Sequence, residues 1–121
     1  MSDSLPTYYK EERPWGSFER FVENEKTTVK FLHLAPGKRF SLQRHAKRGE
    51  YWRVIAGSGT VTIGDETRVF ALGDEARIPQ GVLHRLEGGP DGLTVLEIMT
   101  GEYDENDIER IEDDFGRVPP S

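Results

Sequence analysis

The chain has 121 residues, no cysteine and a formal net charge of −6, a length that suits one domain and excludes a two-domain enzyme. Without cysteine, a disulfide framework, a thiolate zinc site and a cysteine nucleophile are excluded, so any metal must bind nitrogen and oxygen ligands. Residues 1–101 balance 14 basic against 14 acidic side chains, and such a neutral body offers no basic surface for nucleic acid.

Targeting and membrane signals are also missing from the sequence. No run approaches 18 apolar residues, and residues 1–10 lack the basic region and apolar run of a signal peptide. We therefore expect a cytoplasmic protein with no membrane partner and no nucleic-acid partner.

The first part of the chain reads as an arm followed by many short strands. Residues 1–12 show little periodicity and are expected to form a loose arm, and Pro14 and Gly16 then mark a turn around Trp15. We favour Trp15 as a plug at one end of the core over a substrate contact. Short β-rich runs follow, separated by turn residues; they span 17–22, 27–34, 39–45, 51–55, 59–63, 66–71, 75–78, 83–87 and 93–100. This spacing predicts an all-β sandwich or barrel over residues 13–101, with a tight hairpin at Gly64 and Asp65.

The acidic tail, residues 102–117, changes period. Ile108, Ile111 and Phe115 recur at i, i+3 and i+7, with Asp104 in an N-cap position. This pattern predicts one short amphipathic helix on the outer wall of the barrel. The whole chain, 1–121, is thus expected to be a single domain of arm, barrel and tail helix.

Two of the three histidines fall where strands would aim them at a common point. Gln43 and His45 lie two residues apart in a predicted strand and share a face, Glu50 begins the next strand, and His84 follows a later turn. Buried imidazoles and a carboxylate are costly unless paired or metal-bound, and this donor set suits a divalent first-row metal. From spacing alone, a metal site and a hydrogen-bonded polar cluster both stay open.

Lys30 is the candidate catalytic base. It shares strand parity with Leu32 and Leu34, and if those leucines face the core, Lys30 does too. A buried lysine can lose its proton near neutral pH and act as a base. The opposite parity, which would turn Phe31 and His33 inward, is nearly as apolar; we favour the first, which leaves His33 at the surface.

Two spaced motifs resemble those of the cupin family. Their residues are Gly37, Gln43, His45, Glu50 and Gly57 in the first motif and Gly73, Pro79, Gly81 and His84 in the second. Gln43 stands where the commonest version has histidine, and Gly88 where it has asparagine. The resemblance implies a double-stranded β-helix, the jelly-roll barrel of cupins, with Gln43, His45, Glu50 and His84 as metal ligands.

From about residue 12 to 117 the sequence resembles one cupin branch, the C-terminal domain of type II mannose-6-phosphate isomerases. The matching segments are 13–17, 36–39, 41–43, 78–79, 84–87, 100–103 and 112–117, together with His45, Arg48, Glu50 and Trp52. The sequence departs from the family at four positions beside the candidate ligands. The family tends to have His at the positions of Ala46, Lys47 and Tyr51, and Ser or Ala at the position of Gly49. In that family a sugar-nucleotide transferase domain often precedes the cupin, and we expect this chain to be the cupin without it.

The resemblance implies interconversion of mannose 6-phosphate and fructose 6-phosphate. Such an isomerase moves a proton between C1 and C2 through an enediolate, whose negative oxygen a divalent metal stabilises as a Lewis acid. The resemblance implies zinc, with Mn, Fe, Co or Ni left open. Phosphate recognition needs fixed cations at the barrel mouth, and the candidates are Arg48, between the ligands, and Arg117, in the family's terminal motif.

Two other functions stay open at this stage. The first is a non-catalytic metal-containing cupin that binds a sugar or small metabolite. The second is a different metal chemistry, such as that of a dioxygenase, which would favour iron. Whichever function the protein has, we expect a homodimer, because residues 2–10 could add to the sheet edge of a neighbouring copy.

Overall fold

The computed structural model describes residues 5–117, and every regular element in that part of the chain is a β-strand. The strands are β1 (Tyr9–Arg13), β2 (Gly16–Arg20), β3 (Thr27–Leu34), β4 (Leu42–Arg44), β5 (Arg48–Ile63), β6 (Glu66–Ala71), β7 (Glu75–Ile78), β8 (His84–Gly101) and β9 (Glu109–Glu112). This confirms the all-β class. Among these residues no helix with the length and hydrophobicity needed to cross a membrane is found.

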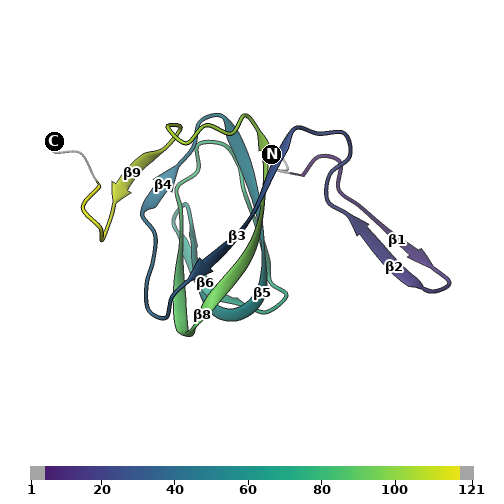
Figure 1. Cartoon of the computed structure of the whole chain (residues 1–121), viewed down its shortest axis with the longest axis horizontal. Coiled ribbons are helices and arrows are strands. Elements are labelled where there is room, and N and C mark those ends of the chain that lie inside the picture. The colour runs from purple at the N-terminus through teal and green to yellow at the C-terminus, as the bar shows by residue number, and fades with distance from the viewer. Residues whose placement is uncertain (1–4, 118–121) are drawn as a thin grey trace.

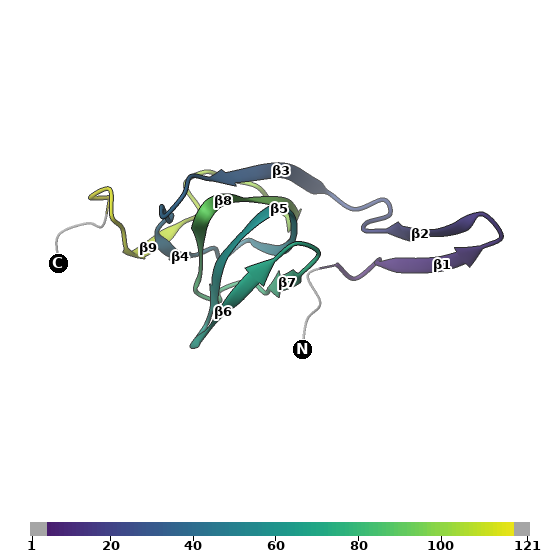
Figure 2. The same ribbon diagram turned by 90° about the horizontal axis from the view of Figure 1, so that it is seen from below.

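Seven strands form one strongly bent sheet around a common core, as Figures 1 and 2 show. The two long strands, β5 and β8, pair antiparallel along almost their whole lengths. On either side of them, β6 and β7 pair with β5, while β3 and β4 pair with β8, and β9 pairs with β4. The inner face of this sheet therefore carries side chains from strands far apart in the sequence.

Both long strands join runs that the sequence predicts as separate. The expected strands 51–55 and 59–63 are two halves of β5, and 83–87 and 93–100 are two halves of β8. The glycines between them mark irregularities rather than chain reversals: Gly57 has φ 72°, and the β5–β8 register shifts on both sides of it. An irregularity of this kind bends a strand without ending it. The hairpin predicted at Gly64 and Asp65 is confirmed, because Ile63 pairs with Glu66.

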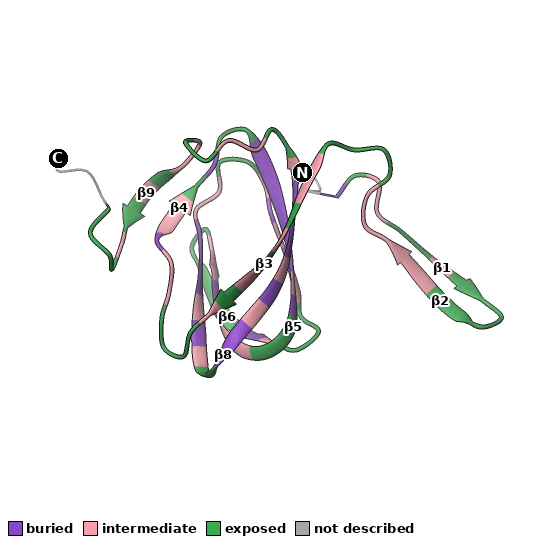
Figure 3. Ribbon diagram, viewed as in Figure 1, coloured by how far each residue is buried: buried purple, intermediate pink, exposed green. Residues whose placement is uncertain are grey.

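The core lies on the inner face of β5 and β8, whose buried residues Figure 3 shows in purple. Its buried members are Trp52, Val54, Val61, Phe70, Ala76, Ile78, Leu86, Leu93 and Val95. A second cluster, of Leu5, Tyr51 and Ile98, covers the outer face of the same strands together with Tyr8, Phe21, Val22 and Leu96. Segments on both sides of β1 and β2 therefore pack on the body of the protein.

Strands β1 and β2 form a two-stranded hairpin that projects away from the body (Figure 1). Tyr9–Arg13, most of it in the predicted loose arm, is a regular strand in this hairpin. Trp15 lies in the turn at its tip, between the paired residues Arg13 and Gly16, and is 73% exposed. The prediction that Trp15 plugs the core is wrong, because the turn containing it connects two strands outside the main sheet.

The prediction of a helix in residues 102–117 is also wrong, since this segment contains turns and the strand β9. Pairing with β4 explains the difference for residues 109–112, and aspartates form turns on either side of them. The Asp104 carboxylate accepts from the backbone N–H of Asn106, and that of Asp113 accepts from the N–H groups of Phe115 and Arg117. Such local side-chain bonds to the backbone compete with helix formation.

Candidate metal centre

His84 and Gln43 belong to one row of side chains that crosses the inner face of the sheet. In β4, Gln43 pairs with His84 of β8 on one side and with Arg110 of β9 on the other, and His84 also pairs with Ile63 of β5. Directly paired residues of neighbouring strands point to the same face of a sheet. A cation, an amide and an imidazole are thus neighbours in space despite their distance in sequence.

A second row carries Lys30 and a buried carboxylic acid. Glu97 of β8 pairs with Lys30 of β3 and with Trp52 of β5. The indole N–H of Trp52 donates to Glu97 Oε2 at 2.8 Å, and the Trp52 ring meets the His84 ring edge-on at 5.4 Å between centroids. The Trp52–His84 contact joins the two rows across the interior of the fold.

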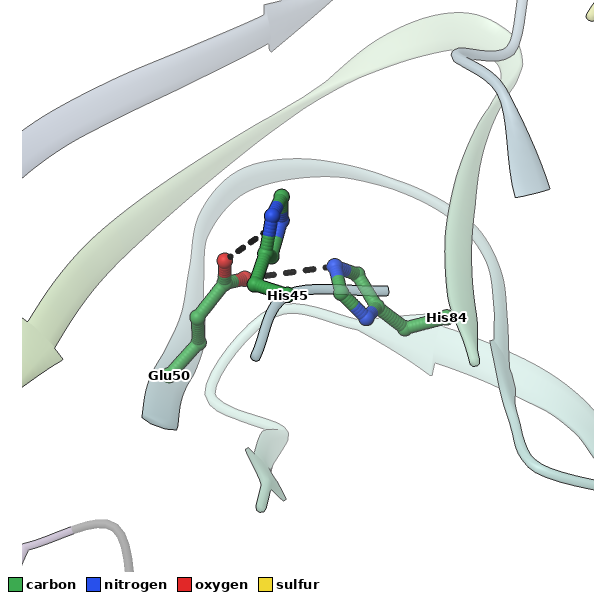
Figure 4. A group of neighbouring side chains, drawn as sticks. All are labelled: His45, Glu50 and His84. Atoms are coloured by element: carbon green, nitrogen blue, oxygen red, sulfur yellow. Dashed lines mark ion pairs between the residues drawn. The ribbon is translucent and has the colours of Figure 1, made fainter. Parts of the chain in front are cut away.

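The side chains of His45, Glu50 and His84 converge, as Figure 4 shows. His45 directly follows β4, Glu50 lies near the start of β5, and His84 begins β8. His45 Nε2 lies 3.1 Å from Glu50 Oε1, and His84 Nε2 lies 3.6 Å from Glu50 Oε2. All three side chains are buried, and their candidate ligand atoms lie within 4.8 Å of one another.

Backbone carbonyl groups hold both imidazoles in the orientation that a metal site needs. Nδ1–H of His45 donates to the Asp107 carbonyl at 2.6 Å, and Nδ1–H of His84 donates to the Val82 carbonyl at 2.9 Å. With Nδ1 engaged in this way, the Nε2 atoms are the ones that face Glu50. Such outer hydrogen bonds fix the tautomer and the ring orientation of metal-binding histidines.

The group also has the unmet bonding capacity expected of a metal centre. Glu50 Oε2 and His84 Nε2 are both buried and have no hydrogen-bond partner among the described residues. Burying such atoms without a partner is unfavourable, so the polar cluster does not satisfy itself. Two imidazole nitrogens and one carboxylate suit zinc and the other divalent first-row metals. The site could hold a metal, as the sequence predicts.

The charge states of the group are compatible with metal binding. Burial alone would raise the pKa of Glu50, but the close contact with His45 and the nearby His84 outweigh it and lower this pKa. Burial lowers the pKa of His84. Glu50 is therefore an anion and His84 a neutral imidazole near neutral pH, the forms in which both side chains bind metals.

Gln43, the fourth predicted ligand, lies beside the group and borders the same cavity as His45. Its Oε1 atom accepts a hydrogen bond from the buried Ser41 hydroxyl at 2.7 Å. A carbonyl oxygen has a second lone pair, so this bond does not prevent it from binding a metal. The role of Gln43 as a ligand stays a prediction.

A cavity of about 630 Å³ opens beside the ligand group, a size typical of small-molecule sites. Lys30 borders it and is half-buried, as are Leu32 and Leu34, whereas Phe31 and His33 are exposed. The parity favoured from the sequence is therefore the observed one. Lys30 Nζ lies 2.7 Å from the Tyr103 hydroxyl.

Arg48 is closer to the ligand atoms than its predicted role in phosphate binding requires. It is 8% exposed, its Nε donates to Glu50 Oε1 at 3.3 Å, and a terminal nitrogen lies 3.2 Å from His45 Nε2. Its guanidinium group also stacks over the Tyr103 ring at 4.9 Å. Arg48 thus lies where the cavity meets the candidate metal centre.

Arg117 is not brought to this site. Its guanidinium group bonds to the Asp113 carboxylate at 2.7 Å. It borders a different hollow, together with Phe31 and Phe115, and Phe31 is an exposed residue on the outer face of β3. The position of Arg117 does not support its predicted role as a phosphate ligand.

The sequence reasoning missed three residues of the site: Glu97, Tyr103 and Arg110. The sequence does contain a signal for Glu97. It lies two residues from Val95 and from Met99, so it shares the face of the strand that carries these apolar side chains and Leu93. Tyr103 and Arg110 have no comparable signal, since they lie in the segment whose spacing predicts a helix.

Comparison with known proteins identifies related sequences along nearly the whole chain. Residues 2–113 match the family model described as "Mannose-6-phosphate isomerase C-terminal". Xanthan biosynthesis protein XanB of Xanthomonas campestris is 39% identical over 108 residues, and mannose-1-phosphate guanylyltransferase ManC of Salmonella typhimurium is 38% identical over 108 residues. Each alignment covers 88% of this chain but only 23% and 22% of the relative. The chain thus spans less than a quarter of the length of these relatives.

Solved structures show the same fold. Oxalate decarboxylase from Bacillus subtilis superposes with a TM-score of 0.66 at 27% identity, covering 78% of this chain and 26% of that one. A Klebsiella pneumoniae protein described as having a double-stranded beta-helix domain superposes with a TM-score of 0.64 at 20% identity, covering 76% and 80%. The architecture is therefore the cupin double-stranded β-helix.

Proposed function

Because the chain belongs to the mannose-6-phosphate isomerase C-terminal family, we propose that it is a metal-dependent sugar-phosphate isomerase. The proposed reaction is the interconversion of mannose 6-phosphate and fructose 6-phosphate, at a divalent metal held by His45, Glu50 and His84 with Gln43 as a fourth ligand. Zinc is the proposed metal, because two imidazole nitrogens, a carboxylate and a weak amide ligand leave a position open for the substrate.

The residues around the cavity have separate proposed roles in this reaction. A bound divalent metal supplies Lewis-acid stabilisation of the negative oxygen of an enediolate. Arg48 adds a fixed positive charge at the same end of the cavity, where that oxygen develops its charge. Lys30 is the proposed base, and its contact with the Tyr103 hydroxyl holds its amine in the cavity.

One observation carries the proposal: a buried set of two imidazoles and a carboxylate has unpartnered atoms, and one of its members, His45, borders a cavity lined by cations. The metal ligands alone are compatible with many reactions. The neighbouring cations favour an anionic substrate, such as a sugar phosphate, over a neutral one.

Variants of two histidines test the proposal. In His84→Ala, zinc binding and the conversion of mannose 6-phosphate to fructose 6-phosphate should both be lost, because a ligand is removed. His33→Ala is the matched control: His33 is exposed and bonds to Thr94 on the outer face, so metal content and turnover should be unchanged. Metal content is measured by mass spectrometry and turnover by a coupled assay. A His84→Ala protein with full activity would contradict the proposal.

A non-catalytic cupin that binds a sugar or metabolite is the second candidate. It is favoured by the names of the relatives, which include a guanylyltransferase, and by the small share of each relative that this chain covers. The departures from the family near the ligands do not strengthen it: Ala46 and Lys47 are exposed, and Tyr51 is buried in the outer cluster. Wild-type protein that binds zinc and shows no turnover would favour this second function.

A further inference from the structure

The cavity beside the candidate metal centre carries a surplus of positive charge. The charged residues that line it, apart from His45, are Lys30, Arg48, Arg110 and Glu105. Lys30 and Arg48 both stack over the Tyr103 ring, at 4.5 and 4.9 Å from its centroid. One aromatic ring thus holds two cations side by side, and only one acidic side chain lies in the same lining.

Arginines elsewhere in the described residues form ion pairs with carboxylates, except Arg68, which bonds to the backbone carbonyl of Glu75. The ion-paired ones outside the cavity are Arg13, Arg20, Arg39, Arg44, Arg53, Arg77, Arg85 and Arg117. Within residues 5–117 no ion pair engages Lys30 or Arg110, and Arg48 pairs with Glu50, the candidate metal ligand. Two cations without an ion pair among these residues, Lys30 and Arg110, therefore lie together at the cavity, whereas most of the other arginines are paired.

Arg110 is the member of this cluster that the sequence did not reveal. It pairs with Gln43 across β9 and β4, and Gln43 pairs with His84, so Arg110 lies on the same face as the candidate ligands. Its Nε atom is buried and has no hydrogen-bond partner among the described residues. A guanidinium group with a free, buried donor beside a cavity is suited to a two-pronged bond with an anion.

We propose that Arg110 binds the phosphate group of the substrate in this cavity, while Lys30 and Arg48, beside Tyr103, keep their proposed roles at the reacting carbons. This inference rests on the proposed function for the identity of the substrate. It replaces Arg117 by Arg110 as the phosphate-binding arginine. A phosphate dianion would neutralise the surplus charge of the cavity, and the metal would lie at one side of the same space.

Wild-type protein allows a first test that needs no substitution. Inorganic phosphate is titrated into the full chain, and the Nε–Hε signals of the arginine side chains are followed by ¹⁵N NMR. The Arg110 signal should shift in a saturable way, because its free donor gains a partner, while the Arg117 signal should not move. An unmoved Arg110 signal alongside saturable phosphate binding would overturn the inference.

Two matched variants give the second test. Arg110→Gln should weaken the binding of inorganic phosphate by about tenfold or more, the usual effect of losing a charge-assisted hydrogen bond. It should also raise KM for mannose 6-phosphate. Arg117→Gln, which removes a surface arginine, should leave both values unchanged. Equal values for Arg110→Gln and wild type would overturn the inference.

The metal-ligand variant Glu50→Ala locates the bound phosphate. If phosphate binds at Arg110, the Glu50→Ala protein should still bind it. If the Glu50→Ala protein loses phosphate binding and the Arg110→Gln protein keeps it, phosphate binds the metal and the inference is contradicted. The proposed function can fail separately. Phosphate binding that depends on Arg110 without any turnover would support the role of Arg110 and refute the isomerase.

Discussion

Glu50 and Glu97 are neighbours on the inner face of the sheet but differ in charge. Burial disfavours ionisation of both carboxyl groups. The two histidines reverse this effect for Glu50 and lower its pKa, whereas burial, together with the negative charge of Glu50, raises the pKa of Glu97. Glu97 is thus a neutral acid beside the anion Glu50, and the indole N–H of Trp52 donates to it.

This arrangement predicts different effects for two substitutions of Glu97. At about pH 5, close to the ordinary pKa of a carboxyl group, Glu97→Gln keeps a neutral polar group beside Glu50 and an oxygen acceptor for Trp52. The free energy of unfolding should therefore change by less than about 1 kcal/mol at this pH. Glu97→Ala leaves the buried indole N–H of Trp52 without its acceptor and should lower the free energy of unfolding by about 1–3 kcal/mol. Urea unfolding of the metal-free proteins measures both values, and equal losses would contradict a hydrogen-bonding role.

The raised pKa of Glu97 also predicts a pH dependence with a definite sign. A carboxyl group whose pKa is raised by folding binds more protons in the folded state, so its contribution is complete at acid pH and is lost as pH rises above the ordinary carboxyl pKa. Between pH 5 and pH 8 the free energy of unfolding should therefore fall more steeply, or rise less steeply, in wild type than in Glu97→Gln. His84 titrates in both proteins, so the comparison isolates Glu97. Parallel pH profiles would contradict the prediction.

The bend in β5 requires a glycine for two reasons, a positive φ angle and a close contact with β8. Gly57 has φ +72°, and a Cβ atom there would lie 2.2 Å from the Gly92 carbonyl oxygen. The backbones of β5 and β8 therefore approach so closely at the bend that only glycine, which has no Cβ atom, fits at this position. The bend is what lets the ends of these strands contribute to both rows of the site.

Alanine substitutions at two glycines test the importance of this close approach. Gly57→Ala combines left-handed backbone strain with a steric clash and should lower the free energy of unfolding by about 2–5 kcal/mol. Gly73→Ala is the control, because Gly73 has φ +86° but a Cβ atom added there would have no neighbouring atom within 4 Å, so only the strain of about 1–2 kcal/mol applies. Thermal or urea unfolding compares the two, and equal losses would show that the close approach does not matter.

Each sequence pattern predicts only the feature that it physically determines. Alternation and turn residues indicate which side chains share a face, so spacing predicts that Gln43, His45, Glu50 and His84 share a face but leaves open whether they bind a metal. For Lys30, spacing favours only slightly the parity that the structure has. The same glycines mark turns and bulges alike, which is why two pairs of predicted strands are continuous in β5 and β8. The tail shows a helical spacing of three apolar residues, but aspartate bonds to the backbone produce turns instead. Tyr103 and Arg110 could be placed only once that segment was known to lie against β4.

At the scale of the whole molecule, the hairpin of β1 and β2 has little support from the rest of the chain. The two strands pair with each other alone among the described residues, and an isolated two-stranded hairpin is marginally stable in water. Trp15 at its tip and Phe31 on the outer face of β3 are large, exposed apolar side chains. We propose that the hairpin packs on a second copy of the chain, which makes the protein a homodimer.

Analytical sedimentation, which gives the molecular mass in solution, tests the proposed dimer directly. Wild-type protein should sediment as a dimer, and Trp15→Ser and Phe31→Ser should both shift it toward the monomer by removing apolar contact area. Val69→Ser is the matched control, because Val69 is equally exposed but lies on β6, and it should leave the dimer intact. A wild-type monomer at micromolar concentration would contradict the proposed dimer.

The proposed isomerase activity depends on a metal held by the two histidines and Glu50. The most direct measurement is a titration of metal-free protein with Zn²⁺, with bound metal and conversion of mannose 6-phosphate to fructose 6-phosphate followed in the same samples. We predict that turnover is absent at the start, rises in proportion to bound zinc and reaches a plateau at one equivalent. Full occupancy with no conversion, or conversion at full rate before any metal is added, would contradict the claim.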